Sequence, residues 1–134
     1  MNDIVVINTM NHDQDRRDDL LGFDHNWNPG AARRFISIDV DTVAALITEG
    51  FLVPDDTQDD SPSAGEFFGF MQRHAGTTAH GYAVEKSRDD YRVSIEGINV
   101  PAECITRECA VEFLDMCRLA DEFIVTPNLF CWYD

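Results

Sequence analysis

The chain has 134 residues, 44% of them hydrophobic, and a formal net charge of −15 from 25 acidic and ten basic side chains. This excess disfavours direct binding to nucleic acid, because phosphate recognition depends on Lys and Arg, and it repels anionic membranes in the same way. Nine Phe, three Tyr and two Trp supply enough apolar surface for a packed core, so we expect one globular domain over residues 1–134 and not a disordered chain.

The N-terminal residues carry no basic cluster and only a short apolar run, residues 4–7. Neither a signal peptide nor a membrane span is expected there or in any later window, which predicts a cytoplasmic protein. In that compartment the four cysteines are expected to be reduced, and most of them to be buried as small hydrophobic side chains: Cys104, Cys109, Cys117 and Cys131.

The first third of the chain is the part with the least regular pattern. Residues 4–7 predict a short buried strand, and a long polar segment over residues 8–34 follows. Within that segment a helical piece is expected around residues 13–23, ended by Gly22. A segment of this length with so little regular structure is typically functional or wrapped on the surface. Residues 35–39 alternate weakly and predict the next strand.

Two helices are expected on either side of an acidic loop. The first begins at Asp41 or Thr42 and runs through residue 49, with Gly50 as its stop. The loop, residues 55–62, is rich in Asp and leads into Ser63, which has capping-box spacing to Glu66. The second helix then presents an apolar stripe at helical spacing, namely Phe67, Phe70, Met71 and, at its end, His74.

The second half of the chain predicts a hairpin, a helix and two short strands. Residues 81–100 alternate on both sides of a turn at residues 88–90, with Tyr82 and Val84 on one face of the first strand and Ala83 on the other. Residues 106–120 form the best helical pattern, and residues 122–133 read as two strands about a turn at Pro127. These elements predict an α+β fold, with a largely antiparallel sheet of about four to six strands packed against about three helices.

Acidic side chains gather in two places where a partner could bind. One is the loop of residues 55–62, and the other is a flank of the last helix, where carboxylates lie within about 80° of arc at 100° per residue. Acidic clusters of this kind often serve as interaction surfaces, although many are only solvated faces. The candidate partner-binding residues are Asp55, Asp56, Asp59, Asp60, Glu108, Glu112, Asp115 and Glu122.

The acidic loop also has part of the spacing of an EF-hand calcium loop. Acidic or hydroxyl side chains recur at alternate positions from Asp55 through Ser63, and Glu66 stands at the twelfth position. The match departs from the motif at Asp60, where the sharp turn requires Gly, and at Pro62. The alternative interpretation is a solvated loop followed by an ordinary helix cap.

No residue is assigned a catalytic, metal-binding or cofactor-binding role from the sequence. The G-x-S-x-G, P-loop and G-x-G-x-x-G patterns are absent, and the four histidines lack zinc-ligand spacing. We therefore expect a small non-enzymatic interaction module that binds a basic protein, of the inhibitor, immunity or nucleic-acid-mimic type. The alternative is a salt-adapted (halophilic) protein, whose acidic surface is an adaptation to concentrated salt. Such a protein could be a small enzyme. The oligomeric state is not indicated.

Overall fold

The computed structural model describes residues 10–57, 60–120, 122–124 and 127–133. At residues 122 and 123 it describes the backbone alone. The strand expected at residues 4–7 and the candidate residue Asp59 lie outside these ranges. The remaining expectations are compared with the structure below.

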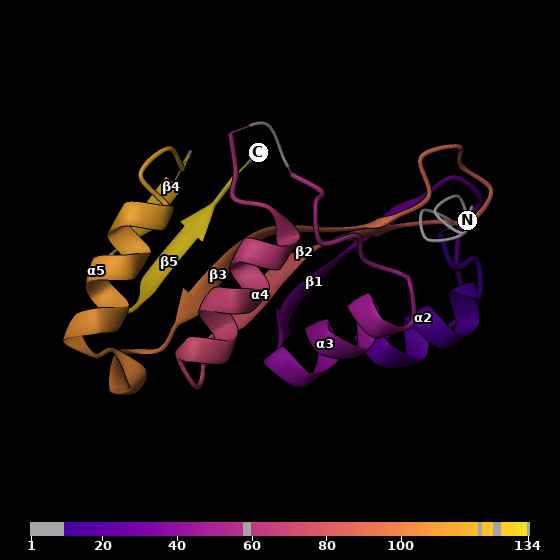
Figure 1. The fold of residues 1–134 in the computed structure, drawn as a ribbon. Helices are drawn as coiled ribbons and strands as arrows, with labels where there is room; N and C mark the ends of the chain where they lie inside the picture. The colour runs from indigo at the N-terminus through magenta and orange to yellow at the C-terminus, as the bar shows by residue number, and fades with distance from the viewer. Residues whose placement is uncertain (1–9, 58–59, 121, 125–126, 134) are drawn as a thin grey trace, which may run out of the picture.

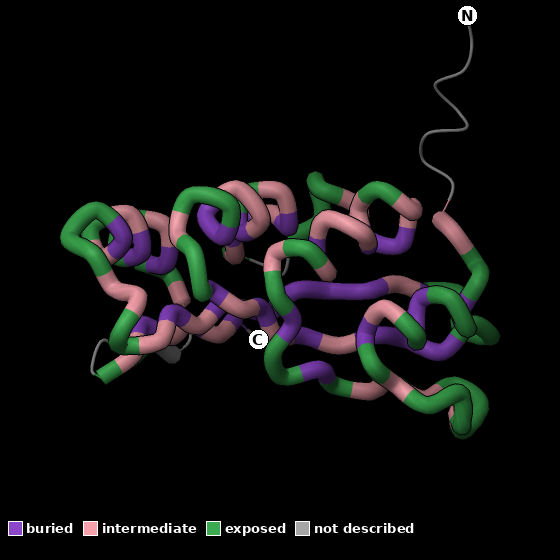
Figure 2. The backbone as a smooth tube through the Cα atoms, turned by 90° about the horizontal axis from the view of Figure 1, so that it is seen from below, coloured by how far each residue is buried: buried purple, intermediate pink, exposed green. Residues whose placement is uncertain are grey.

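A single five-stranded antiparallel sheet organises the described residues. Its strands are β1 (Ala32–Ile38), β2 (Thr78–Val84), β3 (Val93–Val100), β4 (Glu122–Ile124) and β5 (Leu129–Trp132), in the spatial order β1-β2-β3-β5-β4. Figures 1 and 2 show the helices along one face of this sheet, with the other face left open. The α+β fold with an antiparallel sheet is therefore confirmed, including the hairpin of β2 and β3 and the terminal pair β4 and β5.

The described part of the chain has four α-helices: α2 (Gln14–Leu21), α3 (Val40–Thr48), α4 (Ala64–Arg73) and α5 (Arg107–Met116). A 3₁₀ turn, Ala102–Cys104, precedes α5. Each α-helix begins at a side-chain cap, and the capping box of Ser63 and Glu66 is present as predicted. Gly22 ends α2 with a φ of 76°, which a residue without Cβ adopts at no steric cost.

Two helix boundaries differ from the prediction. The cap of α3 is Asp39, whose carboxylate accepts from the backbone N–H of Thr42, so Asp41 and Thr42 are already inside the helix. The last helix ends at Met116, although the apolar pattern continues to residue 120. Cys117 follows the helix in a turn and is fully buried, so the apolar pattern continues beyond the last helical residue.

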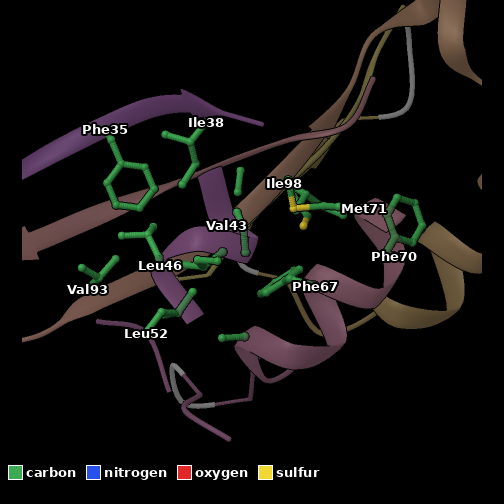
Figure 3. Packing of buried hydrophobic residues seen from close by; sticks show 14 of the residues in the cluster. Phe35, Ile38, Val43, Leu46, Leu52, Phe67, Phe70, Met71, Val93 and Ile98 are labelled. Carbon is green, nitrogen blue, oxygen red and sulfur yellow. The ribbon is translucent and has the colours of Figure 1, made fainter. Parts of the chain in front are cut away.

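The core lies between the sheet and the helices. Figure 3 shows side chains of α3 and α4, among them Leu46, Phe67 and Phe70, meeting β3 at Ile98. These four side chains have no exposed surface. Burying one such side chain contributes about 1.5–3 kcal/mol, so this layer supplies the main stabilisation of the arrangement.

Side chains of β2 alternate between the covered and the open face of the sheet, as expected for a strand. Ala83 is fully buried on the helix side, whereas Tyr82 points to the open face and is half-buried. On β3 the polar residues Ser94 and Glu96 are buried. Arg34 of β1 covers Glu96 through an ion pair, so neighbouring strands shield polar groups that a two-strand hairpin would leave in water.

The four cysteines are free thiols, as expected. Cys109, Cys117 and Cys131 are buried, and Cys104 is half-buried. The Sγ atoms of Cys117 and Cys131 lie 3.1 Å apart and join the end of α5 to β5. The contact with Cys131, together with burial, raises the pKa of the Cys117 thiol far above its ordinary value. These sulfurs therefore act as core side chains in their thiol form.

Candidate functional site

A groove between α4 and α5 brings together part of the acidic loop and part of the last helix. Its volume is about 500 Å³, and it is lined by Asp60, Ser61, Pro62, Gly65, Glu66, Gly69, Arg73, Glu112, Asp115, Met116, Arg118 and Leu119. We call it the acidic groove. Residues more than fifty positions apart in the sequence meet here because α4 and α5 lie side by side on the covered face (Figure 1).

The groove gathers three of the eight predicted binding residues, Asp60, Glu112 and Asp115. Asp55 and Asp56 are exposed in the same loop but lie outside its lining, and Glu108 is exposed on α5. Asp56 instead borders a small hollow of about 10 Å³, where partial burial raises the pKa of its carboxyl group. Glu122 lies in β4 and Asp59 outside the described residues, so the structure gives neither side chain a position.

An ion-pair network forms one wall of the groove. Glu112 of α5 accepts from Arg73 Nε at 3.0 Å and contacts His74 Nε2 at 2.7 Å, both at the end of α4. The Arg73 guanidinium, followed by the His74 contact, lowers the pKa of the Glu112 carboxyl group against the opposing effect of partial burial. The network therefore fixes the distance between the two helices and leaves little of the Glu112 charge for a ligand.

The remaining acids of the groove are more available. The Asp115 side chain is 84% exposed and has only a 3.8 Å contact with Arg118, and Asp60 is exposed at the opposite rim. Glu66 also lines the groove, but its carboxylate accepts from the Ser63 backbone N–H at 2.8 Å in the capping box. Four carboxylates and two guanidinium groups give the lining a formal charge of −2.

The groove also offers apolar surface. Met116 and Leu119 line it from the end of α5, and Leu119 is 58% exposed. Gly65 and Gly69 lie one helical turn apart on α4, so the backbone of that helix approaches the groove surface there. Exposed apolar side chains beside carboxylates are typical of a surface that meets a basic residue flanked by apolar ones.

The charged groups of the groove lining are carboxylates and guanidinium groups. Among the described residues that line the groove there is no His or Cys, and the histidine of the His74–Glu112 pair lies behind the lining. Glu66, the twelfth position of the EF-hand-like spacing, is engaged in helix capping.

A second polar cluster escaped the sequence reasoning. In α2 the inward-facing residues are mostly polar, and Arg17 and Asp18 have fully buried side chains that form an ion pair at 3.2 Å. Arg17 also donates to the Val84 carbonyl oxygen at 2.6 Å, and Trp27 Nε1 donates to Asp18 at 2.8 Å. The buried positions 14, 17, 18 and 21 of α2 do have helical spacing in the sequence. A search for apolar stripes does not detect them, because three of the four residues are polar.

Ligand-type atoms of Asp15, Asp18 and His25 lie within 4.8 Å of one another beside this cluster. Asp18 Oδ1 already accepts from Arg17, and Oδ2 accepts from Trp27. His25 contacts Asp19 at 2.9 Å, and this contact, with Asp15 nearby, raises the pKa of the imidazole. The three groups are therefore committed to an intramolecular network that positions α2 and the following loop.

Comparison of the chain with models of known protein families, with curated proteins and with solved structures gives no match. The functional argument therefore depends on the chain's own residues. None of the helices in the described ranges is both long and apolar enough to cross a bilayer.

Proposed function

We propose that the protein is a small non-enzymatic interaction module that binds a basic protein partner in the acidic groove. The observation that carries the proposal is that Asp60 and Asp115, which come from two separate acidic segments, line the same groove of about 500 Å³. A partner would place a Lys or Arg side chain between these carboxylates and an apolar side chain against Met116 and Leu119.

The charge of the whole chain supports the same function. A net charge of −15 attracts a basic protein over a long range and raises its association rate at low salt. The two helices that form the groove are held at fixed spacing by Arg73 and Glu112, so little ordering of the site is needed on binding. An inhibitor, an immunity protein or a nucleic-acid mimic, acting in the cytoplasm, would use its surface in this way.

The test compares two variants of equal charge. Asp60→Asn/Asp115→Asn removes two charges from the groove, and Asp89→Asn/Glu103→Gln removes two exposed charges outside its lining. Each protein is immobilised, exposed to lysate from its own source at low salt and eluted by raising the salt. We expect the wild type and the second variant to retain the same basic protein, and the groove variant to bind it about tenfold or more weakly.

Two results would contradict the proposal. One is recovery of no basic protein by the wild type. The other is equal weakening by both variants, which would mean that the partner responds to net charge alone and not to the groove.

A further inference from the structure

The open face of the sheet carries a second hollow, opposite the helices. Its volume is about 670 Å³, within the range of about 300–1,000 Å³ typical of small-molecule sites. Four strands contribute to it, and its lining is Arg34, Phe35, Ile36, Ser37, Thr78, His80, Asn99, Phe130 and Trp132. We call it the open-face hollow.

The acid surplus of the chain does not extend into this hollow. Strands β2 and β5 contain no charged residue. The only charged side chain in the lining is Arg34, which donates to the buried Glu96 carboxylate. Ile36, at the edge of the hollow, is 83% exposed. A ligand here therefore meets a nearly neutral, partly apolar surface on a protein that is otherwise strongly acidic.

Aromatic rings provide a flat contact surface. The rings of His80 and Phe130 are stacked, with centroids 5.0 Å apart and planes within 13° of each other. Trp132 lies two residues further along β5, on the same face as Phe130, because side chains alternate along a strand. Rings arranged in this way favour a planar ligand over a bulky aliphatic one.

The hollow also has a polar edge with one acceptor and one donor. His80 Nε2 donates to the Cys131 carbonyl oxygen at 3.0 Å, so in the neutral ring Nδ1 is an acceptor. Burial lowers the pKa of His80, which keeps the ring neutral at ordinary pH. Asn99 Oδ1 accepts from Asn128 Nδ2 at 3.3 Å, which leaves the N–H groups of the Asn99 amide as donors.

Backbone features around the hollow support a shaped site. A Cβ at Gly97 would lie 2.7 Å from His80 Nε2 and 2.0 Å from the Cys131 carbonyl oxygen, so the absence of a side chain there makes room for the imidazole. The register of the sheet shifts between Phe35 and Ile38 and between His80 and Gly81, both at the hollow. Such irregularities occur preferentially next to functional sites, where they redirect side chains.

We infer that the open-face hollow binds an uncharged, planar heteroaromatic molecule of about purine size. Its ring would lie against Phe130 and Trp132, and its polar edge would donate to His80 Nδ1 and accept from Asn99 Nδ2. This activity is separate from partner binding in the acidic groove, because the two sites share no lining residue.

Calorimetric titration of the full chain with inosine and adenosine tests this inference, with 2-naphthalenemethanol as an aromatic probe that lacks the heteroaromatic edge. We expect a nucleoside to bind with a Kd below about 1 mM, and the naphthyl probe at least about tenfold more weakly. Asn99→Ala should weaken nucleoside binding about tenfold, the effect of one lost hydrogen bond in a desolvated site. Tyr82→Phe, on the same face outside the lining, should leave binding unchanged.

Urea unfolding of both variants shows whether each is folded, and Phe130→Leu provides a second substitution within the lining. The inference is overturned if neither nucleoside binds at millimolar concentration, or if Asn99→Ala and Phe130→Leu both bind as the wild type does. Equal affinity for the naphthyl probe would also overturn it, since the polar edge would then contribute nothing. A dimer in sedimentation that Trp132→Ala dissociates would show that a second copy of the chain occupies this face instead.

Discussion

At the scale of single residues, we expect substitution of the buried Arg17 to reduce stability strongly. Its guanidinium is fully buried against Asp18, and it lies 5.0 Å from the Tyr91 ring centroid and 5.2 Å from that of Trp27. The neighbouring Arg16 is a natural control, because its ion pair with Glu49 is on the surface, with 49% of the Arg16 side chain exposed. Two adjacent arginines of one helix thus have opposite environments.

We predict that Arg17→Met lowers the free energy of unfolding by about 3–5 kcal/mol, because it leaves Asp18 buried without its cation. Arg16→Met should have a much smaller effect, since exposed ion pairs are screened by water. Urea unfolding of both variants measures the difference. Equal effects would show that the buried pair is not maintained in solution.

Asp39 gives a prediction about pH. Hydrogen bonds from the Thr42 backbone N–H and hydroxyl group lower the pKa of the Asp39 carboxyl group below its ordinary value. A carboxyl group with a lowered folded-state pKa stabilises the protein above its unfolded pKa, and this contribution is lost as pH falls through the folded value. Asn caps a helix about as well as Asp but does not titrate.

We therefore expect Asp39→Asn to have nearly wild-type stability at about pH 7 and a smaller loss of stability between about pH 5 and about pH 2. Chemical unfolding at a series of pH values measures the slope. Asp41→Asn, in the first turn of the same helix, serves as the control. A slope as steep as that of the wild type would mean that Asp39 does not cap α3 in its charged form.

At the level of elements, the approach of β5 to β3 depends on Gly97. A Cβ there would lie 2.0 Å from the Cys131 carbonyl oxygen, a backbone atom of the neighbouring strand that cannot move aside without separating the strands. At Gly69 of α4, by contrast, the nearest atom to a Cβ is the end of the flexible Arg73 side chain, at 3.1 Å. The two glycines therefore differ in what a methyl group would displace.

We predict that Gly97→Ala destabilises the protein by about 3 kcal/mol or more, through overpacking between strands. Gly69→Ala should leave stability within about 1 kcal/mol of wild type, because the better helix propensity of Ala offsets a small shift of Arg73. Thermal and urea unfolding of the two variants provide the comparison. A neutral Gly97→Ala would contradict the observed spacing of β3 and β5.

The elements also show which patterns could be read in advance. The capping box at Ser63, the stop at Gly22 and the hairpin of β2 and β3 depend on residues close in sequence, and these predictions are confirmed. The face to which Tyr82 points was not predicted. Alternation fixes only that Tyr82 and Ala83 point to opposite faces, and the helices decide which face becomes the core.

For the whole molecule, self-repulsion at a net charge of −15 is the main electrostatic term. Salt shortens the Debye length from about 30 Å at 0.01 M to about 3 Å at 1 M, so it should weaken this repulsion. An interaction module would be folded at low salt and gain modestly from screening. A salt-adapted protein would instead depend on concentrated salt for folding.

We expect a cooperative thermal transition in about 0.01 M KCl and a rise of Tm by roughly 5 °C or more in about 1 M KCl. Adding calcium at constant ionic strength should leave Tm unchanged, since Glu66 serves as a helix cap. Folding only near molar salt would favour the salt-adapted alternative. A rise of Tm in calcium that Asp55→Asn abolishes would favour the EF-hand-like loop.

The sequence by itself determined the fold class, the helix boundaries at Gly22 and Ser63 and the two acidic segments, because caps, periodicity and net charge are properties of neighbouring residues or of composition. Only the tertiary structure decided that Asp60 and Asp115 line one groove while Asp55 does not, that α2 buries Arg17, and that the open face holds a hollow lined by aromatic rings and a single charged side chain. Each of these depends on contacts between segments far apart in the chain. Local pattern does not encode those distances, because they are set by the packing of whole elements.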